Sequence, residues 1–172
     1  MARKKARPAR KKASRKVRKP ARKTAAPGQT LMAYLAVAGT AKAIAFYKRA
    51  FGAKELYRLT EPGSGRIGHA EIKIGNSVLS LSDEYPEFDV IGPDRIGGSP
   101  VRMTLMVRNA DTAVKKAMAA GVTIVSPLKD EFYGFRAGSV RDPFGYVWHL
   151  MHQIAKVTPR EMQKRMNKMA AG

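Results

Sequence analysis

The pair of side chains best suited to acid–base chemistry in this 172-residue chain is His69 and Glu71. Both lie in the segment 67–74, whose alternation of apolar and polar residues predicts a β-strand. Side chains two positions apart on a strand share a face, so this imidazole and carboxylate could line a cavity and exchange a proton. A solvated or salt-bridged outer face of the sheet is the alternative. His69 and Glu71 are therefore catalytic candidates.

The other two histidines, His149 and His152, lie near the end of the chain. Three positions separate them, which places them on opposite faces of a predicted strand over residues 146–152. His149 is the third catalytic candidate, as a base or a metal ligand, although we favour a histidine that is simply hydrogen-bonded in or beside a cavity. The chain has no cysteine, and this excludes thiol nucleophiles, disulfides and thiolate metal sites.

A third group of residues could bind a ligand. The guanidinium of Arg136 could hold a carboxylate or phosphate through two hydrogen bonds, while the rings of Tyr133 and Trp148 cover an apolar part of the molecule. The alternative is structural. Trp148, the only tryptophan, would then fill the core, and Arg136 would pair with Asp142 or Glu131.

Two similar series of predicted elements must position these groups. The first is a strand over 30–37, a helix over 41–51 with Thr40 as its N-cap, and strands over 55–60, 67–74 and 77–82. The second is a strand over 101–107, a helix over 111–120, and strands over 122–125, 135–140 and 146–152. Residues 83–100 form the linker.

Equivalent positions of the two series keep a nearly constant offset: 70 residues from Val37 to Val107, 69 from Gly52 to Gly121, and 70 from Gly75 to Gly145. An internal duplication explains this spacing. The sequence therefore predicts an α+β domain over residues 28–157, with tandem β-α-β-β-β modules at about 30–84 and 100–154. Residues 158–172 then form a short C-terminal helix. It begins with a capping box from Thr158 to Glu161, and a methionine stripe along it is expected to pack on the domain or on a dimer partner.

The first 27 residues have a very different composition. They contain thirteen Lys or Arg, no Asp or Glu, and one sizeable aliphatic residue, Val17. Such a segment cannot bury enough apolar surface to offset its ordering entropy, so we expect it to be disordered on its own. The remaining chain has twenty basic and thirteen acidic residues, a net charge of +7. The tail therefore supplies most of the positive charge.

We predict that this tail binds nucleic acid without sequence preference, through phosphate contacts whose affinity falls steeply with salt. A merely solubilising tail, or one for another polyanion, is the alternative. The predicted contact residues are Arg3, Lys4, Lys5, Arg7, Arg10, Lys11, Lys12, Arg15, Lys16, Arg18, Lys19, Arg22 and Lys23. The sequence has neither the apolar core of a secretory signal nor a membrane helix. We expect no membrane partner. We also expect the protein to be cytoplasmic, and to associate with the nucleoid if the tail binds DNA.

Several segments carry a family resemblance. They are AIAFYKRAFGA at 43–53, GHAEI at 68–72 and SDE at 82–84, then FYGFR at 132–136, DPFGYVW at 142–148 and TPREMQ at 158–163. In this order they resemble the vicinal-oxygen-chelate superfamily of glyoxalases, bleomycin-resistance proteins and dioxygenases, and within it the PhnB-like branch. The resemblance implies two curved half-open sheets that enclose a cavity, and a homodimer. The basic tail lies outside it and resembles the tails of linker histones and bacterial histone-like proteins.

The resemblance also bears on metal binding. Metal-using relatives hold the ion with His, Gln or Glu on the first and last strands of each module. Projected onto this chain, those positions fall on Met32, on Leu79 or Ser80, on Arg102 and on His149. Only His149 is a good ligand, whereas a divalent ion takes about four to six donors. We therefore predict no metal site and no cofactor, and a divalent metal is the disfavoured alternative.

Two functions remain open. The first is a domain of the glyoxalase/bleomycin-resistance type that binds a small molecule, or is a metal-independent enzyme of unknown substrate, and is tethered to nucleic acid by its tail. The second is a non-catalytic, nucleoid-associated DNA-binding protein that uses the domain as a dimerising body. Lyase or dioxygenase chemistry is implied by the resemblance alone, and its usual metal ligands are largely missing. Whether the protein is an enzyme stays open at this point.

Overall fold

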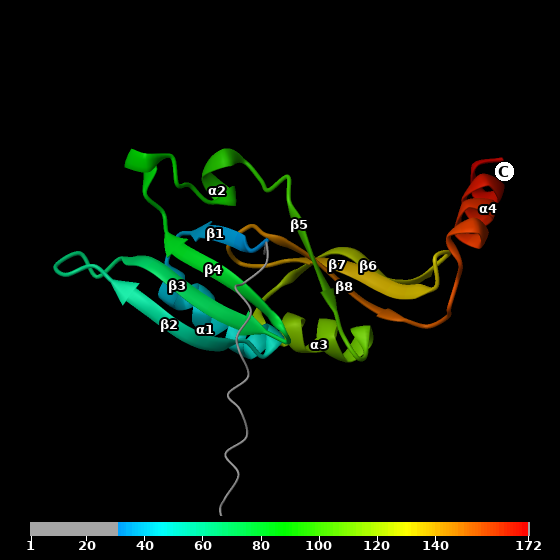
Figure 1. The fold of residues 1–172 in the computed structure, drawn as a ribbon, viewed down its shortest axis with the longest axis horizontal. Coiled ribbons are helices and arrows are strands. Elements are labelled where there is room, and N and C mark those ends of the chain that lie inside the picture. Colours follow the sequence, from blue (N-terminus) through cyan, green and yellow to red (C-terminus); the bar gives the residue numbers. More distant parts are fainter. Residues whose placement is uncertain (1–30, 172) are drawn as a thin grey trace, which may run out of the picture. The chain divides into compact units, whose positions relative to one another are not determined.

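The computed structural model describes residues 31–171, which form two four-stranded mixed sheets with helices packed on them (Figure 1). This confirms the predicted α+β class. The basic segment 1–27, with its predicted disorder and its nucleic-acid contacts, lies outside the described residues. Within the described residues, no helix is long and apolar enough to cross a membrane.

The first module has the predicted order of strand, helix and three strands. Its strand β1 is parallel to β4, whereas β3 is antiparallel to both β4 and β2, so the sheet order is β1-β4-β3-β2. The bounds are β1 Ala33–Val37, α1 Thr40–Phe51, β2 Lys54–Thr60, β3 Ile67–Ile74 and β4 Ser77–Asp83.

The second module repeats this arrangement, with sheet order β5-β8-β7-β6 and a parallel pair of β5 and β8. Its elements are β5 Arg102–Met106, α3 Ala110–Ala120, β6 Thr123–Glu131, β7 Phe135–Arg141 and β8 Val147–Gln153. The helices α1 and α3 begin 70 residues apart, as do β4 and β8. The predicted repeat of two β-α-β-β-β modules is confirmed.

One core joins the two modules. The helices α1 and α3 lie side by side (Figure 1), and α1 buries Ala43, Ile44, Tyr47 and Ala50, which the helical repeat brings to one side. The rings of Tyr47 and Phe51 of α1 approach the indole of Trp148 of β8, with ring centroids 5.5 and 4.6 Å apart. Aromatic contacts between α1 and β8 therefore connect the first module to the second.

Each sheet has one face toward the helices and one face away from them. On the first sheet, Leu35, Ile72 and Leu81 are buried in the core. The residues that alternate with them, such as Tyr34 and Glu71, project from the other side, which we call the open face. The open face is only partly covered in the single chain, because Tyr34 is 52% exposed.

Three details differ from the sequence predictions. Helix α1 is capped by Gly39 rather than by Thr40, whose backbone N–H donates to Asp83 Oδ1 across 2.7 Å. Strand β6 runs on to Glu131 instead of ending at residue 125; it is an edge strand, where Pro127 is tolerated because one side of the strand needs no partner. The linker contains η1 Pro86–Phe88 and α2 Pro93–Ile96, each begun by a proline.

The C-terminal helix α4 spans Pro159–Ala170. Its predicted cap is confirmed, since Thr158 Oγ1 accepts a hydrogen bond from the Glu161 N–H across 3.3 Å. The methionine stripe is not packed on the domain, because Met166 and Met169 are 51% and 66% exposed. Only Met162, at the start of the stripe, is half-buried in the single chain, and packing of the stripe on a dimer partner stays a prediction.

Candidate functional site on the open face of the first sheet

The predicted pair His69 and Glu71 lies on one face of β3, as the alternation required. His69 Nε2 is 3.7 Å from Glu71 Oε1. A third residue, Tyr57 of β2, joins them because it stands opposite Glu71 in the antiparallel register. Its hydroxyl donates to Glu71 Oε1 across 3.0 Å and lies 3.1 Å from His69 Nε2. We call these three residues the His69 cluster.

The hydrogen bonds of the cluster fix the histidine tautomer. A tyrosine hydroxyl has one hydrogen, and here it is directed to Glu71. His69 Nε2 must then carry the hydrogen that lies between it and the Tyr57 oxygen. In the neutral imidazole this leaves Nδ1 as the proton acceptor, and Nδ1 makes no hydrogen bond within residues 31–171. The geometry provides a histidine with one nitrogen occupied and one available.

Aromatic rings flank the imidazole of His69. The ring centroid of Tyr34 is 5.8 Å away and that of Tyr57 is 5.6 Å away. Tyr34 reaches the cluster across the sheet, since Tyr34 and Glu71 are both paired in register with Ser80 of β4. Desolvation, and secondarily the hydrogen bond to Glu71, raise the pKa of Tyr57. Tyr57 therefore stays protonated near neutral pH and remains a donor.

A hollow with polar and apolar walls adjoins the cluster. It has a volume of about 330 Å³ and is lined by Tyr34, Glu61, Gly68, Ser82, Tyr85, Phe88 and Val90. Ser82 is 1% exposed, and its hydroxyl has no hydrogen-bond partner in the described residues. A buried hydroxyl without a partner is energetically costly, and this oxygen is almost fully enclosed by the protein. We call this space the Ser82 hollow.

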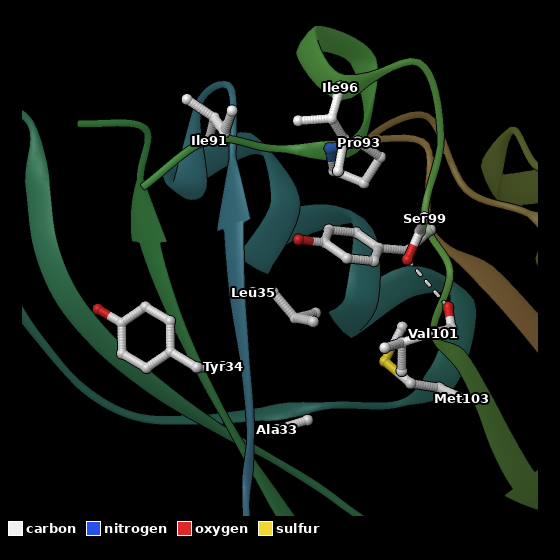
Figure 2. A pocket seen from close by; sticks show the side chains of 10 residues that line it. Ala33, Tyr34, Leu35, Ile91, Pro93, Ile96, Ser99, Val101 and Met103 are labelled. Carbon is white, nitrogen blue, oxygen red and sulfur yellow. Dashed lines mark hydrogen bonds between the residues drawn. The ribbon is translucent and has the colours of Figure 1, made fainter. Parts of the chain in front are cut away.

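An apolar cavity lies on the side of β1 to which Leu35 projects (Figure 2). It measures about 300 Å³ and is bounded by β1, the linker and the start of β5 (Figure 2). Its lining residues are Ala33, Tyr34, Leu35, Ile91, Pro93, Ile96, Ser99, Val101, Met103 and Tyr146. Figure 2 shows that Tyr34 and Leu35 project to different sides of β1. Tyr34 borders both spaces, but its ring projects away from the apolar cavity, which lies on the side of β1 to which Leu35 projects (Figure 2).

His149 and His152 face opposite sides of β8, as predicted from their spacing. His149 Nδ1 lies 3.0 Å from the hydroxyl of Ser139, its register partner on β7. His152 Nδ1 accepts a hydrogen bond from the Ala110 N–H at the start of α3, across 3.0 Å. His149 belongs to the second sheet and forms no part of the His69 cluster; its catalytic role stays a prediction.

Tyr133, Arg136 and Trp148 do not lie together in one site. Trp148 is 2% exposed and lies in the core, where its indole N–H donates to Asp142 Oδ2 across 2.8 Å. Tyr133 is half-buried, with its ring against those of Phe132 and Phe135. Their predicted role in ligand binding is untested.

Arg136 is occupied by two ion pairs. It contacts Asp111 across 2.8 Å and Asp130 across 2.9 Å, and hydrogen bonds to these two carboxylates raise its pKa. The partners predicted from the sequence, Asp142 and Glu131, are wrong. Asp111 lies in the first turn of α3 and is brought to β7 by the fold, whereas the carboxylate of Asp142 is buried among other donors.

The residues at the projected metal positions do not fit a divalent ion. The Ser80 hydroxyl donates to the sulfur of Met32 across 3.7 Å, and Arg102 brings a positive charge. A thioether and a guanidinium cannot serve a hard divalent cation, which leaves His149 alone among these positions. In residues 31–171, no group of three or more His, Cys, Asp or Glu could hold a metal ion.

These modules, each with its first strand parallel to its fourth, define a known class of fold. The model of the Glyoxalase/Bleomycin resistance protein/Dioxygenase superfamily matches residues 28–150, and the chain belongs to this superfamily. It is 36% identical over 145 residues to the uncharacterized protein Mb0911c of Mycobacterium bovis, an alignment that covers 83% of this chain and 95% of that one.

Similar proteins also occur outside the mycobacteria. The uncharacterized protein At5g48480 of Arabidopsis thaliana is 34% identical over 125 residues, with 67% of this chain and 73% of that protein covered. Its X-ray structure superposes with a TM-score of 0.59 at 28% identity, over 72% of this chain and 98% of that one. The crystal structure of TioX from Micromonospora sp. ML1 gives a TM-score of 0.56 at 27% identity, over 76% and 100%.

Proposed function

We propose that this chain binds a small molecule over the open face of the first sheet, and that His69 and Glu71 transfer a proton there without a divalent ion. The observation that supports this most is the position of the Tyr57 hydroxyl, within hydrogen-bond distance of both His69 and Glu71. A surface salt bridge needs no such third group. A connected donor, acceptor and base is the arrangement that general acid–base catalysis requires.

Each part of the site has a role in this proposal. His69 Nδ1 accepts a proton from the ligand, while Tyr57 and Glu71 hold the imidazole in the required tautomer. Glu61, which lines the Ser82 hollow, offers a carboxylate acceptor to a polar part of the ligand. The rings of Tyr34, Tyr85 and Phe88, which line the same hollow, can cover an apolar part.

Hydrogen–deuterium exchange tests the proton transfer directly. The full chain is incubated in D₂O with a collection of small carbonyl compounds, and loss of their α-proton signals is followed by NMR. We expect exchange above the buffer rate, unaffected by EDTA, and reduced about 10²-fold or more in His69→Gln. His152→Gln is the matched control, because His152 faces the helices and not the open face. Exchange that EDTA abolishes and a divalent ion restores would contradict the proposal, as would full exchange in His69→Gln.

We further propose a homodimer and a place in the PhnB-like branch of the superfamily. The segments quoted above support the branch, and exposed apolar side chains support the dimer. Leu59 on the first sheet and Met106 on the second are 61% and 58% exposed. Light scattering coupled to size exclusion measures the mass: about twice the 18.9 kDa of the chain is expected, and a monomeric mass contradicts the dimer.

The composition of residues 1–27 favours a second function, non-specific binding of nucleic acid, which would make the domain either a tethered catalyst or a non-catalytic dimerising body. Thirteen cations without one acid support it. Deletion of residues 1–27 is expected to abolish salt-sensitive DNA binding and to leave the melting temperature nearly unchanged. DNA binding that survives the deletion would refute a role for the tail.

A further inference from the structure

Two lysines face each other at one end of the β2–β3 pair. Lys54 and Lys73 are exposed, and they are direct partners in the antiparallel register. Like charges directly opposite each other on a sheet destabilise it, so the fold alone gives no reason for this pair. A bound anion would turn the repulsion into a shared attraction.

The two lysines border a hollow. Its volume is about 310 Å³, and its other lining residues are Gly52, after α1, and Gly75, in the β3–β4 turn. Both glycines have left-handed backbone conformations, with φ of 68° and 60°. No atom would meet a Cβ at Gly75 within 4 Å, so the space in front of this turn is open. We call it the lysine hollow.

A third cation stands beside the lysine hollow. Lys116 of α3 reaches toward Gly52, with its Nζ 3.9 Å from the place that a Cβ on Gly52 would take. A cation at the carboxyl end of α1 also interacts favourably with the helix dipole, and this accounts for Lys116 on structural grounds. The dipole does not account for Lys54 and Lys73.

No carboxylate neutralises these charges. Within residues 31–171, none of the three lysines forms an ion pair. The acid next to Lys54 in the sequence, Glu55, is already held by Lys48 across 2.6 Å and by Arg58. The hollow is therefore a concave surface with uncompensated positive charge.

We propose that the lysine hollow binds a phosphate group, either free phosphate or the phosphate of a small ester. Two ammonium groups and a nearby third suit the charge and the several acceptor oxygens of a phosphate better than those of a monovalent carboxylate. The inference does not rest on the proton transfer proposed above, because His69, Glu71 and Tyr57 do not line this hollow.

The test is a titration of the ¹⁵N-labelled full chain with sodium phosphate, compared with sodium chloride at equal ionic strength. We expect saturable shifts of the Gly52, Lys54, Lys73 and Gly75 amides with phosphate only. Lys73→Gln should weaken this binding about tenfold, which corresponds to the loss of one charge contact. Lys115→Gln, on α3 but outside the hollow, is the matched control and should bind as the unchanged chain does.

A second titration, with glycerol 3-phosphate, distinguishes free phosphate from a phosphate ester as the ligand of the lysine hollow. Tighter binding of the ester supports a phosphorylated metabolite, and tighter binding of phosphate supports the free ion. Melting temperatures show whether Lys73→Gln is folded, and Lys54→Gln provides a second variant. Shifts that do not saturate, that chloride reproduces, or that persist in both variants would overturn the proposal.

Discussion

The hydroxyl of Tyr47, in the helix of the first module, donates a hydrogen bond to Asp142 Oδ2 across 2.8 Å, in the second module. Asp142 also accepts the Trp148 indole N–H and the backbone N–H groups of Phe144 and Tyr146. Asp142 is 4% exposed, and no cation pairs with it in the described residues. Four donors therefore take the place of water around it, and one of them ties the modules together.

Tyr47→Phe removes the donor that crosses between the modules. The ring and its packing remain, but Asp142 loses one of its four hydrogen bonds inside the core. We expect the free energy of unfolding to fall by about 1–3 kcal/mol, the cost of a buried polar group that loses a partner. Urea denaturation measures this change, with Tyr34→Phe as an exposed control expected to lie within about 0.5 kcal/mol of the unchanged chain. Equal effects of the two variants would refute the special role of Tyr47.

Asp142 should also make the free energy of unfolding depend on pH in a distinctive way. Burial raises the pKa of its carboxyl, and the hydrogen bonds of Trp148 and Tyr47 only partly oppose this. The folded state therefore keeps the proton at pH values where the unfolded state has lost it. The contribution of Asp142 to stability accordingly falls as the pH rises from the ordinary pKa of 3.8 through the raised value, and is constant above it.

The variant Asp142→Asn isolates this effect, because the other carboxyl groups are common to both proteins. The difference in the free energy of unfolding between the unchanged chain and the variant should shrink as the pH rises from 3.8 through the raised pKa. Urea denaturation at a series of pH values measures it. A difference that grows with pH would show that the donors outweigh burial and that the pKa is lowered.

Much of the fold could be predicted from the sequence, because periodicity and glycine positions mark local structure. The constant offset between Gly52 and Gly121 revealed the duplication, and alternation placed His69 and Glu71 on one face. Tyr57 was missed, because a register shift between Glu55 and Tyr57 decides which residue of β2 stands opposite Glu71. An irregularity of this kind leaves no mark on the alternation of apolar and polar residues.

Ion-pair partners were harder to predict for a related reason. The sequence suggested neighbours of Arg136 along the chain, but Asp111 stands 25 residues away and is brought there by the packing of α3 on the second sheet. Charge attraction is not selective by itself, so tertiary packing decides which carboxylate is in reach. The same reasoning explains why Tyr34 could not be assigned to the site, since it lies two strands from His69.

Glu55 is expected to lose its stabilising role in acid. Hydrogen bonds from Arg58, and next from Lys48, lower its pKa to about 2. A depressed pKa in the folded state contributes stability above the ordinary value of 4.5, which is lost as the pH falls from 4.5 toward 2. Because these pairs lie at the surface and are screened by water, Glu55→Gln should cost only about 0.5 kcal/mol at pH 7.

Urea denaturation of the unchanged chain and of Glu55→Gln, at pH 7 and at pH 2 to 3, measures this difference. It should narrow in acid, and it should also narrow in high salt, since salt screens exposed charges. A difference that is the same at both pH values would mean that Glu55 stabilises the protein by packing and not by its charge.

Tyr57→Phe tests whether the Tyr57 hydroxyl selects the tautomer of His69. In the unchanged chain the hydroxyl oxygen lies 3.1 Å from His69 Nε2, so the neutral imidazole should carry its hydrogen on Nε2. The phenylalanine keeps the flanking ring but removes that oxygen, and we expect ¹⁵N NMR of the imidazole to show a mixture of tautomers. Proton exchange with the carbonyl collection should fall only about twofold, in proportion to the fraction of His69 that no longer presents a free Nδ1. Tyr34→Phe is the control, because the Tyr34 hydroxyl donates to the Gly68 carbonyl and not to His69. This variant should leave the His69 tautomer unchanged. An Nδ1–H tautomer in the unchanged chain would refute the assignment of Nδ1 as the base.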